Sequence, residues 1–217
     1  MKNKSKYILP VVSLLLFIIL IVIIKTVDVS PTGVGSTEIG LYHLNSTVHS
    51  ALGTNQTWYK ITEVLGLISI ACGGIFAIIG LLQLIKRKSL FKVDREILSL
   101  GGLYIALGII YVFFEKVIIN YRPVIMPGES VAEASFPSSH TVLAAVIAIS
   151  IMMIIDKYVK KHAAQNIIKA VLAALAVITV VGRLLSGVHW FTDILGGVFL
   201  SVFLLSVFNL FIKTDKQ

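Results

Sequence analysis

The sequence predicts an all-α fold: a polytopic membrane helix bundle with six transmembrane helices and an interfacial helix before the second span. Apolar residues make up 57% of the 217-residue chain, charged residues only 14%, and the mean hydropathy is +0.93. These values lie far from the averages of soluble domains. Apolar runs of about 20 residues, the length that crosses the hydrocarbon of a bilayer, recur along the chain. We therefore expect residues 1–217 to form one integral membrane domain.

The apolar runs are separated by short polar segments. The first run follows a basic N-terminus, but it is long and no small-x-small cleavage site follows it before Asp28, so we interpret it as a retained anchor. Cys72, the only cysteine, lies within the second run, which excludes disulfide and thiolate-metal frameworks. The expected spans are about Ile8–Ile24, Ile61–Ile85, Ile97–Ile119, Thr141–Ile155, Ile167–Leu185 and Phe191–Ile212.

The segment between the first two spans contains a candidate amphipathic helix. It begins with the turn-rich DVSPTGVGST and continues into EIGLYHLNSTVHSALG, in which apolar residues recur at helical spacing. Such a helix lies in the membrane interface. His43 and His49 are six residues apart with no nearby cysteine or carboxylate pair, so we interpret them as interfacial polar residues rather than ligands. The apolar residues at helical spacing are Leu41, Leu44, Val48 and Leu52.

The basic residues indicate the orientation of the chain. Lysine and arginine concentrate in cytoplasmic loops, and with the N-terminus inside, fourteen of the nineteen fall on that side. We therefore expect a multi-pass cell-membrane protein with both termini cytoplasmic. The net charge of +8 does not indicate nucleic-acid binding, because these residues lie at span ends rather than on one continuous face. The fourteen are Lys2, Lys4, Lys6, Lys86, Arg87, Lys88, Lys92, Arg95, Lys157, Lys160, Lys161, Lys169, Lys213 and Lys216; the other five are Lys25, Lys60, Lys116, Arg122 and Arg183.

Three outer stretches carry polar residues that the spans do not explain. They are Lys116–Pro123, Phe136–Thr141 and Gly182–Asp193, and on the expected topology all three lie at the extracytoplasmic face. Within the third, His189 and Asp193 are at i and i+4, so if the sixth span begins near His189 the carboxylate can hold one ring nitrogen. The other nitrogen is then free to attack, as in a catalytic nucleophile with its orienting group. The alternative is an interfacial polar pair beside Trp190 in the aromatic belt.

The second stretch predicts an anion site. Residues 137–140, PSSH, read as a helix start with a serine cap, and free amides at a helix N-terminus bind phosphate. His140 lies on the first turn, where its alternative role is that of a capped interfacial residue. Arg122 and Arg183 supply guanidinium groups that grip phosphate oxygens bidentately. Together these groups predict a phosphoryl-transfer site.

These residues resemble the type-2 phosphatidic acid phosphatase family, which includes lipid phosphate phosphatases and shares a fold with vanadate haloperoxidases. The pattern is Arg-Pro, then Pro-Ser-x-His, then arginine followed after five residues by histidine and after three more by aspartate. The resemblance covers most of the chain in layout. The matching residues are Arg122 and Pro123, then Pro137, Ser138, Ser139 and His140, then Arg183, His189 and Asp193.

The resemblance implies a mechanism. His189 attacks the phosphorus, Asp193 orients it, and His140 protonates the leaving oxygen, after which water hydrolyses a phosphohistidine intermediate. No metal or other cofactor is required. The groups that bind the phosphate oxygens are Arg122, Arg183, Ser138 and Ser139, with Lys116 as a further candidate.

The sequence departs from the family pattern at three positions. Ser139 stands where the second motif usually has glycine, and Gly182 stands where serine is common. In the first motif, six residues usually separate the lysine from the arginine, whereas Lys116 and Arg122 are separated by five; Glu115 has the usual spacing. One residue is about 100° around a helix, so Lys116 is rotated away from the position of the family's lysine. We therefore expect Arg122 and Arg183 to carry most of the anion binding.

A site at span ends suits a lipid headgroup at the membrane surface with its tail between helices. Phosphatidylglycerol phosphate, phosphatidate and undecaprenyl pyrophosphate all meet this requirement. Two other classes are possible. A transporter buries its charges near the midplane and often has inverted repeats, and a non-catalytic lipid-binding protein has no need of both histidines and the aspartate. The clustering of all these groups at one face favours the enzyme.

Overall fold

The structure, a computed structural model, describes residues 5–35, 37–126 and 128–212. Its helices are α1 (Ile8–Thr26), α2 (Tyr42–Leu52), α3 (Gln56–Arg87), α4 (Arg95–Lys116), α5 (Ser139–Tyr158), α6 (His162–Leu185) and α7 (Phe191–Ile212). A two-stranded antiparallel hairpin of β1 (Ser30–Pro31) and β2 (Glu38–Ile39) precedes α2, and two short 3-10 helices cover Ser5–Tyr7 and Leu90–Lys92.

Six of these helices are long and apolar enough to cross a membrane, and α2 is the additional short helix. This confirms the predicted all-helical fold with six spans. The largest difference in length is at α3, which has 32 residues where the second expected span had 25. Asn55 caps it, accepting from the amides of Thr57 and Trp58 at 3.0 and 3.1 Å. At about 1.5 Å per residue, α3 is longer than the ~30 Å hydrocarbon core. Its first turns extend beyond the apolar run and carry polar residues, which is why the apolar pattern predicted a shorter span.

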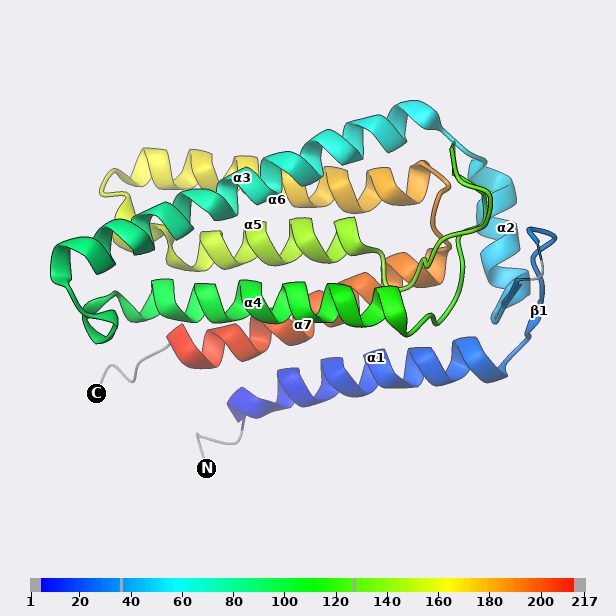
Figure 1. The fold of residues 1–217 in the computed structure, drawn as a ribbon, viewed down its shortest axis with the longest axis horizontal. Helices are drawn as coiled ribbons and strands as arrows, with labels where there is room; N and C mark the ends of the chain where they lie inside the picture. Colours follow the sequence, from blue (N-terminus) through cyan, green and yellow to red (C-terminus); the bar gives the residue numbers. More distant parts are fainter. Residues whose placement is uncertain (1–4, 36, 127, 213–217) are drawn as a thin grey trace.

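The helices run side by side, with α2 lying across one end of the bundle and the two described ends of the chain at the other (Figure 1). The central helix is α5, which contacts α3, α6 and α7. Its residues Ala144, Val146 and Ala148 are fully buried, and small side chains of this kind let neighbouring helices approach closely. The outward faces of the bundle expose leucine, isoleucine and valine, as expected of surfaces that meet lipid.

Helix α2 is attached to the start of α7 by a buried side chain. The Asn45 carboxamide accepts from the amide of Thr192 at 3.1 Å and donates to the Thr192 hydroxyl at 3.1 Å and to the Gly40 carbonyl at 3.0 Å. In addition, His49 Nε2 donates to the Gly187 carbonyl at 3.1 Å. The expected interfacial histidine therefore reaches the loop between α6 and α7, whereas His43 is exposed and pairs with Asp28.

The third expected span ends early, at Lys116 rather than Ile119. The chain then becomes extended, because Asn120 and Arg122 pair with a returning segment: the amide of Ser135 donates to the Asn120 carbonyl and that of Arg122 to the Glu133 carbonyl, both at 3.0 Å. This pairing closes the loop from α4 to α5 over the end of the bundle that carries α2 (Figure 1).

Candidate active site

His189 lies in the turn between α6 and α7, and α7 begins two residues later at Phe191. The sixth span therefore does not include His189, and the condition under which the i, i+4 spacing places the two side chains on one helix face is not met. Asp193 is on the first turn of α7, and its Oδ2 reaches back to accept the amide of Trp190 at 2.9 Å. This contact brings Oδ2 within 3.5 Å of His189 Nδ1, so the two groups are adjacent by a different route.

Ser135 lies between the imidazole and the carboxylate. Its hydroxyl is 3.1 Å from His189 Nδ1 and donates to Asp193 Oδ2. The second carboxylate oxygen of Asp193 accepts from the Asn120 carboxamide at 2.8 Å. Because Asp193 receives three donors and is fully buried, it is a rigid acceptor for the chain of hydrogen bonds that starts at the histidine.

Arg183 fixes the protonation of the imidazole. Its Nη2 lies 3.3 Å from His189 Nε2, and since a guanidinium only donates, Nε2 is the acceptor and Nδ1 carries the proton. Burial lowers the pKa of His189 to about 4; Asp193 opposes this shift and Arg183 adds to it. The imidazole is therefore neutral at neutral pH, and its Nε2 carries a lone pair rather than a proton.

The start of α5 brings Ser139 and His140 to the same place. Ser138 is the cap residue, but its hydroxyl does not cap the helix: it accepts from Thr141 at 3.1 Å, and its amide donates to the Asp193 carbonyl at 3.1 Å. Ser138 is thus buried against α7, whereas Ser139 and His140 line a cavity. The first amides of α5 beyond Ser138 have no intrahelical partner and are free to bind an anion.

Arg122 reaches the cavity from the loop after α4. Its Nε is 3.2 Å from Glu133 Oε2, without hydrogen-bond geometry, and its Nε and Nη1 are buried with no hydrogen-bond partner within the described residues. The same holds for Nε of Arg183. Buried guanidinium donors without partners are suited to a phosphate, which accepts several hydrogen bonds at once.

The structure does not bring Lys116 to this cavity. Lys116 is exposed at the last position of α4, and Glu115, which has the spacing usual for the family's lysine, lines the cavity instead. The difference follows from the rotation of about 100° per residue along a helix. The role expected for Lys116 therefore has no geometric support.

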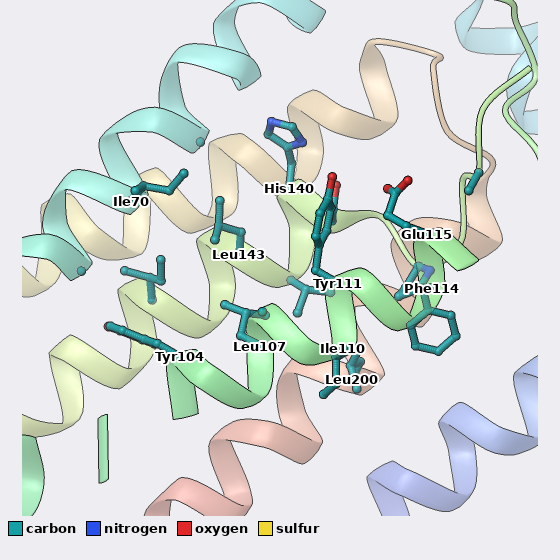
Figure 2. A pocket seen from close by; sticks show the side chains of 18 of the residues that line it. Ile70, Tyr104, Leu107, Ile110, Tyr111, Phe114, Glu115, His140, Leu143 and Leu200 are labelled. Atoms are coloured by element: carbon teal, nitrogen blue, oxygen red, sulfur yellow. The ribbon is translucent and has the colours of Figure 1, made fainter. Parts of the chain in front are cut away.

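The cavity has a volume of about 610 Å³ and extends between α3, α4 and α5. His140 and Glu115 lie toward one end of it and Tyr104 toward the other (Figure 2). Between these ends the lining is almost entirely apolar, and it includes Gly73 and Gly74 of α3. An apolar cavity with polar groups gathered at one end matches an amphipathic ligand.

Glu63, Ser135 and Asn120 are polar residues of the site that the motifs did not identify. Glu63, on the second turn of α3, contacts both Arg183 and His140. A signal for Glu63 was present, because it is the only charged residue in the second expected span, and an ionisable residue inside a span is a functional candidate by default. Ser135 had no such signal, since it is a loop serine outside any motif.

A buried histidine, its carboxylate partner and guanidinium groups with unpaired donors thus lie together beside an apolar cavity, an arrangement suited to phosphoryl transfer. A sequence model of the PAP2 superfamily matches residues 71–217, and the chain belongs to this superfamily. Among solved structures, it is similar to the first transmembrane PAP2 type phosphatidylglycerolphosphate phosphatase from Bacillus subtilis, with a TM-score of 0.68 and 20% identity over 97% of this chain and 100% of that one. No curated protein sequence matches the chain.

Proposed function

We propose that the protein hydrolyses the phosphate or pyrophosphate headgroup of a membrane lipid through a phosphohistidine on His189. The observation that carries the proposal is the position of Nε2: it is unprotonated, faces the Arg183 guanidinium, and lies at the polar end of an apolar cavity. His140, at the same end, is placed to protonate the leaving oxygen. A non-catalytic lipid-binding protein needs neither the hydrogen-bonded imidazole nor its carboxylate.

The residues divide the work of the reaction between them. Asp193 and Ser135 hold Nδ1–H of the nucleophile and balance the positive charge that develops when Nε2 bonds to phosphorus. Arg183 and Arg122, with the first amides of α5, stabilise the equatorial oxygens of the five-coordinate transition state. Departure of the leaving oxygen breaks the P–O bond, and His140 supplies its proton. Water then attacks the phosphohistidine and releases inorganic phosphate and free His189.

The apolar length of the cavity supports a lipid substrate. Its chain would lie between α3 and α4, toward Tyr104, while the phosphate stays beside His140. Phosphatidylglycerol phosphate, phosphatidate and undecaprenyl pyrophosphate all fit this description. Phosphatidylglycerol phosphate is the first candidate, because the similar Bacillus subtilis structure is that of a phosphatidylglycerolphosphate phosphatase.

Phosphate release from these three lipids and from a soluble aryl phosphate, measured in detergent and in liposomes, tests the proposed function. We expect activity that persists in EDTA, since the charges that the reaction needs come from arginines, and inhibition by vanadate, which mimics the five-coordinate transition state. Loss of activity in EDTA with recovery in magnesium would contradict this mechanism. Absence of release from every lipid would contradict the function.

Gly74→Leu adds a structural arm to the same experiment. Gly74 lines the cavity and a Cβ there meets no atom within 4 Å, so a leucine at this position begins in open space and its side chain takes up cavity volume. We expect kcat/KM for long-chain lipids to fall by about tenfold or more, the scale of lost methylene contacts, with the aryl phosphate unaffected. Gly102→Leu is the matched control, because Gly102 also has open space but does not line the cavity. Equal loss for both substrates would place the lipid tail elsewhere.

We further propose that the site faces the extracytoplasmic side. The described ends of the chain lie at the end of the bundle opposite α2 (Figure 1), and α2 contacts the turn that carries His189. The basic residues near the chain ends and in the loops beside them support a cytoplasmic location for that end. Lys2, Lys4, Lys213 and Lys216, which contribute to this asymmetry, lie outside the described residues.

Single cysteines at Ser50 and Lys160, in a background without Cys72, test the orientation. An impermeant thiol reagent should label position 50 in intact cells and position 160 only after permeabilisation. Ser50 lies on α2 at the site end, and Lys160 lies in the α5–α6 turn at the other. Labelling at position 160 but not at position 50 in intact cells would mean that the site faces the cytoplasm and would contradict the proposed orientation.

A further inference from the structure

The Glu63 carboxylate lies among the groups that the proposed mechanism assigns to the phosphate. Its Oε1 accepts from Arg183 Nη1 at 2.9 Å and lies 3.3 Å from His140 Nε2. The other terminal nitrogen of the same guanidinium, Nη2, contacts Nε2 of His189, the proposed nucleophile. One carboxylate oxygen therefore occupies a position between the cation that binds the phosphate and the histidine that protonates the leaving oxygen.

Helix α3 is held close to this position by two glycine contacts. A Cβ on Gly182 would lie 2.7 Å from Thr62 Cγ2, and a Cβ on Gly66 would lie 2.8 Å from the His140 ring. The absence of these side chains lets the second turn of α3 lie directly against α6 and the start of α5. The glycine at position 182, one of the departures from the family pattern, is thus explained by the approach of the turn that carries Glu63.

Glu63 and Arg183 differ strongly in exposure. The Arg183 side chain is completely buried, whereas 41% of the Glu63 side chain is exposed. A buried guanidinium needs a negative partner at all times, while a half-exposed glutamate on a helix surface has room to rotate into the cavity mouth. If a phosphate bound Arg183 while the Glu63 carboxylate stayed in place, the two negative charges would be adjacent and would repel each other strongly.

We propose that Glu63 is a resident anion, which neutralises Arg183 in the empty enzyme, is displaced by the substrate phosphate, and returns to help expel inorganic phosphate. This inference rests on the proposed function and adds a role for a residue outside the family motifs. A pocket with two arginines would otherwise retain its product. The carboxylate lowers the affinity of the site for every phosphate by competing for the same donors.

Binding of inorganic phosphate and orthovanadate to Glu63→Gln tests this role. Each affinity is measured twice: as an inhibition constant against the aryl phosphate, and as the rise in melting temperature that the anion causes in the purified protein. We expect inhibition constants about 5- to 100-fold lower than in the wild type, the usual range of coupling between competing sites. We also expect a lower melting temperature without anion and a larger rise with it, because ligand binding then restores the missing charge.

Glu115→Gln is the matched control, because it removes the same charge from the wall of the same cavity without a contact to Arg183. Its effect on the inhibition constants should be clearly smaller. Equal effects of the two substitutions would mean that any negative charge in the cavity wall weakens anion binding, whether or not it contacts Arg183. That result would overturn the proposal. If Glu63→Gln cannot be purified without an anion, Glu63→Asp replaces it, and its retracted carboxylate should also tighten binding.

Unchanged or weaker anion binding in both Glu63 variants would overturn the proposal, because it would make Glu63 part of the phosphate site or of its support. This result is distinct from failure of the proposed function. If the proposed function fails, the wild type itself releases no phosphate from any lipid and is not stabilised by either anion. Both proposals are then wrong.

Discussion

Replacing His189 with alanine is expected to lower phosphate release by roughly 10⁴-fold or more, since the substitution removes the proposed covalent nucleophile and with it the proposed reaction path. The substitution also removes the acceptor of the Arg183 contact at 3.3 Å, but it leaves Asp193 held by Asn120 and Trp190. The site should therefore remain folded. The decisive measurement is a rapid acid-free quench that detects a covalent phosphoenzyme in the wild type and none in the variant.

His43→Ala is the matched control for this experiment. His43 is also a histidine on the site end of the molecule, but its side chain is 86% exposed, and it pairs with Asp28 and packs against the ring of Tyr42. We expect this variant to retain both turnover and the intermediate. An acid-labile phosphoenzyme that persists in His189→Ala would show that another residue is the nucleophile.

Replacing His140 with alanine should have an effect that depends on the leaving group. General-acid catalysis contributes about 10²–10⁴-fold when the leaving oxygen is basic. The loss should therefore be severe for a lipid monophosphate, whose leaving group is an alkoxide, intermediate for a lipid pyrophosphate, and small for an aryl phosphate. The measurement is kcat/KM of one variant with three substrates.

Equal losses across the three substrates would show that His140 is not the general acid. Gly66 is packed against the ring of His140, so alanine at position 140 also leaves a space beside α3. His140→Asn fills most of that space without a titratable nitrogen and separates lost packing from lost proton transfer. If the asparagine restores activity toward the lipid monophosphate, the role of His140 is structural.

The motifs predicted the candidate site where it depends on short spacing along the chain. His189 and Asp193 are close together, and His140 and Ser139 lie at a helix start, because these arrangements follow from a few consecutive residues. The helices themselves were predicted by long apolar runs. The failure at Lys116 concerns rotation: Glu115 and Lys116 both lie on the last turn of α4, and only the packing of the whole helix decides that Glu115 lines the cavity.

Groups that act through tertiary contact were not predicted. Ser135 lies 54 residues before His189, and Asn45 lies 147 residues before Thr192. Neither belongs to a periodic pattern or a local motif, so only the folded chain brings them to the site. Glu63 is an intermediate case, because its charge was visible within an apolar run but its partners were not.

The partners of Arg183 have a consequence for where the working enzyme begins. Besides His189, its side-chain contacts are Thr62 and Glu63, with the Tyr59 ring 5.2 Å from its guanidinium carbon, and all three precede residue 71, where the match to the superfamily starts. The stretch by which relatives are recognised therefore lacks the counter-charge of its own buried arginine. A protein shortened to that stretch would keep the motif residues and lose these three contacts of Arg183, so the recognisable segment is smaller than the part of the chain that builds the candidate site.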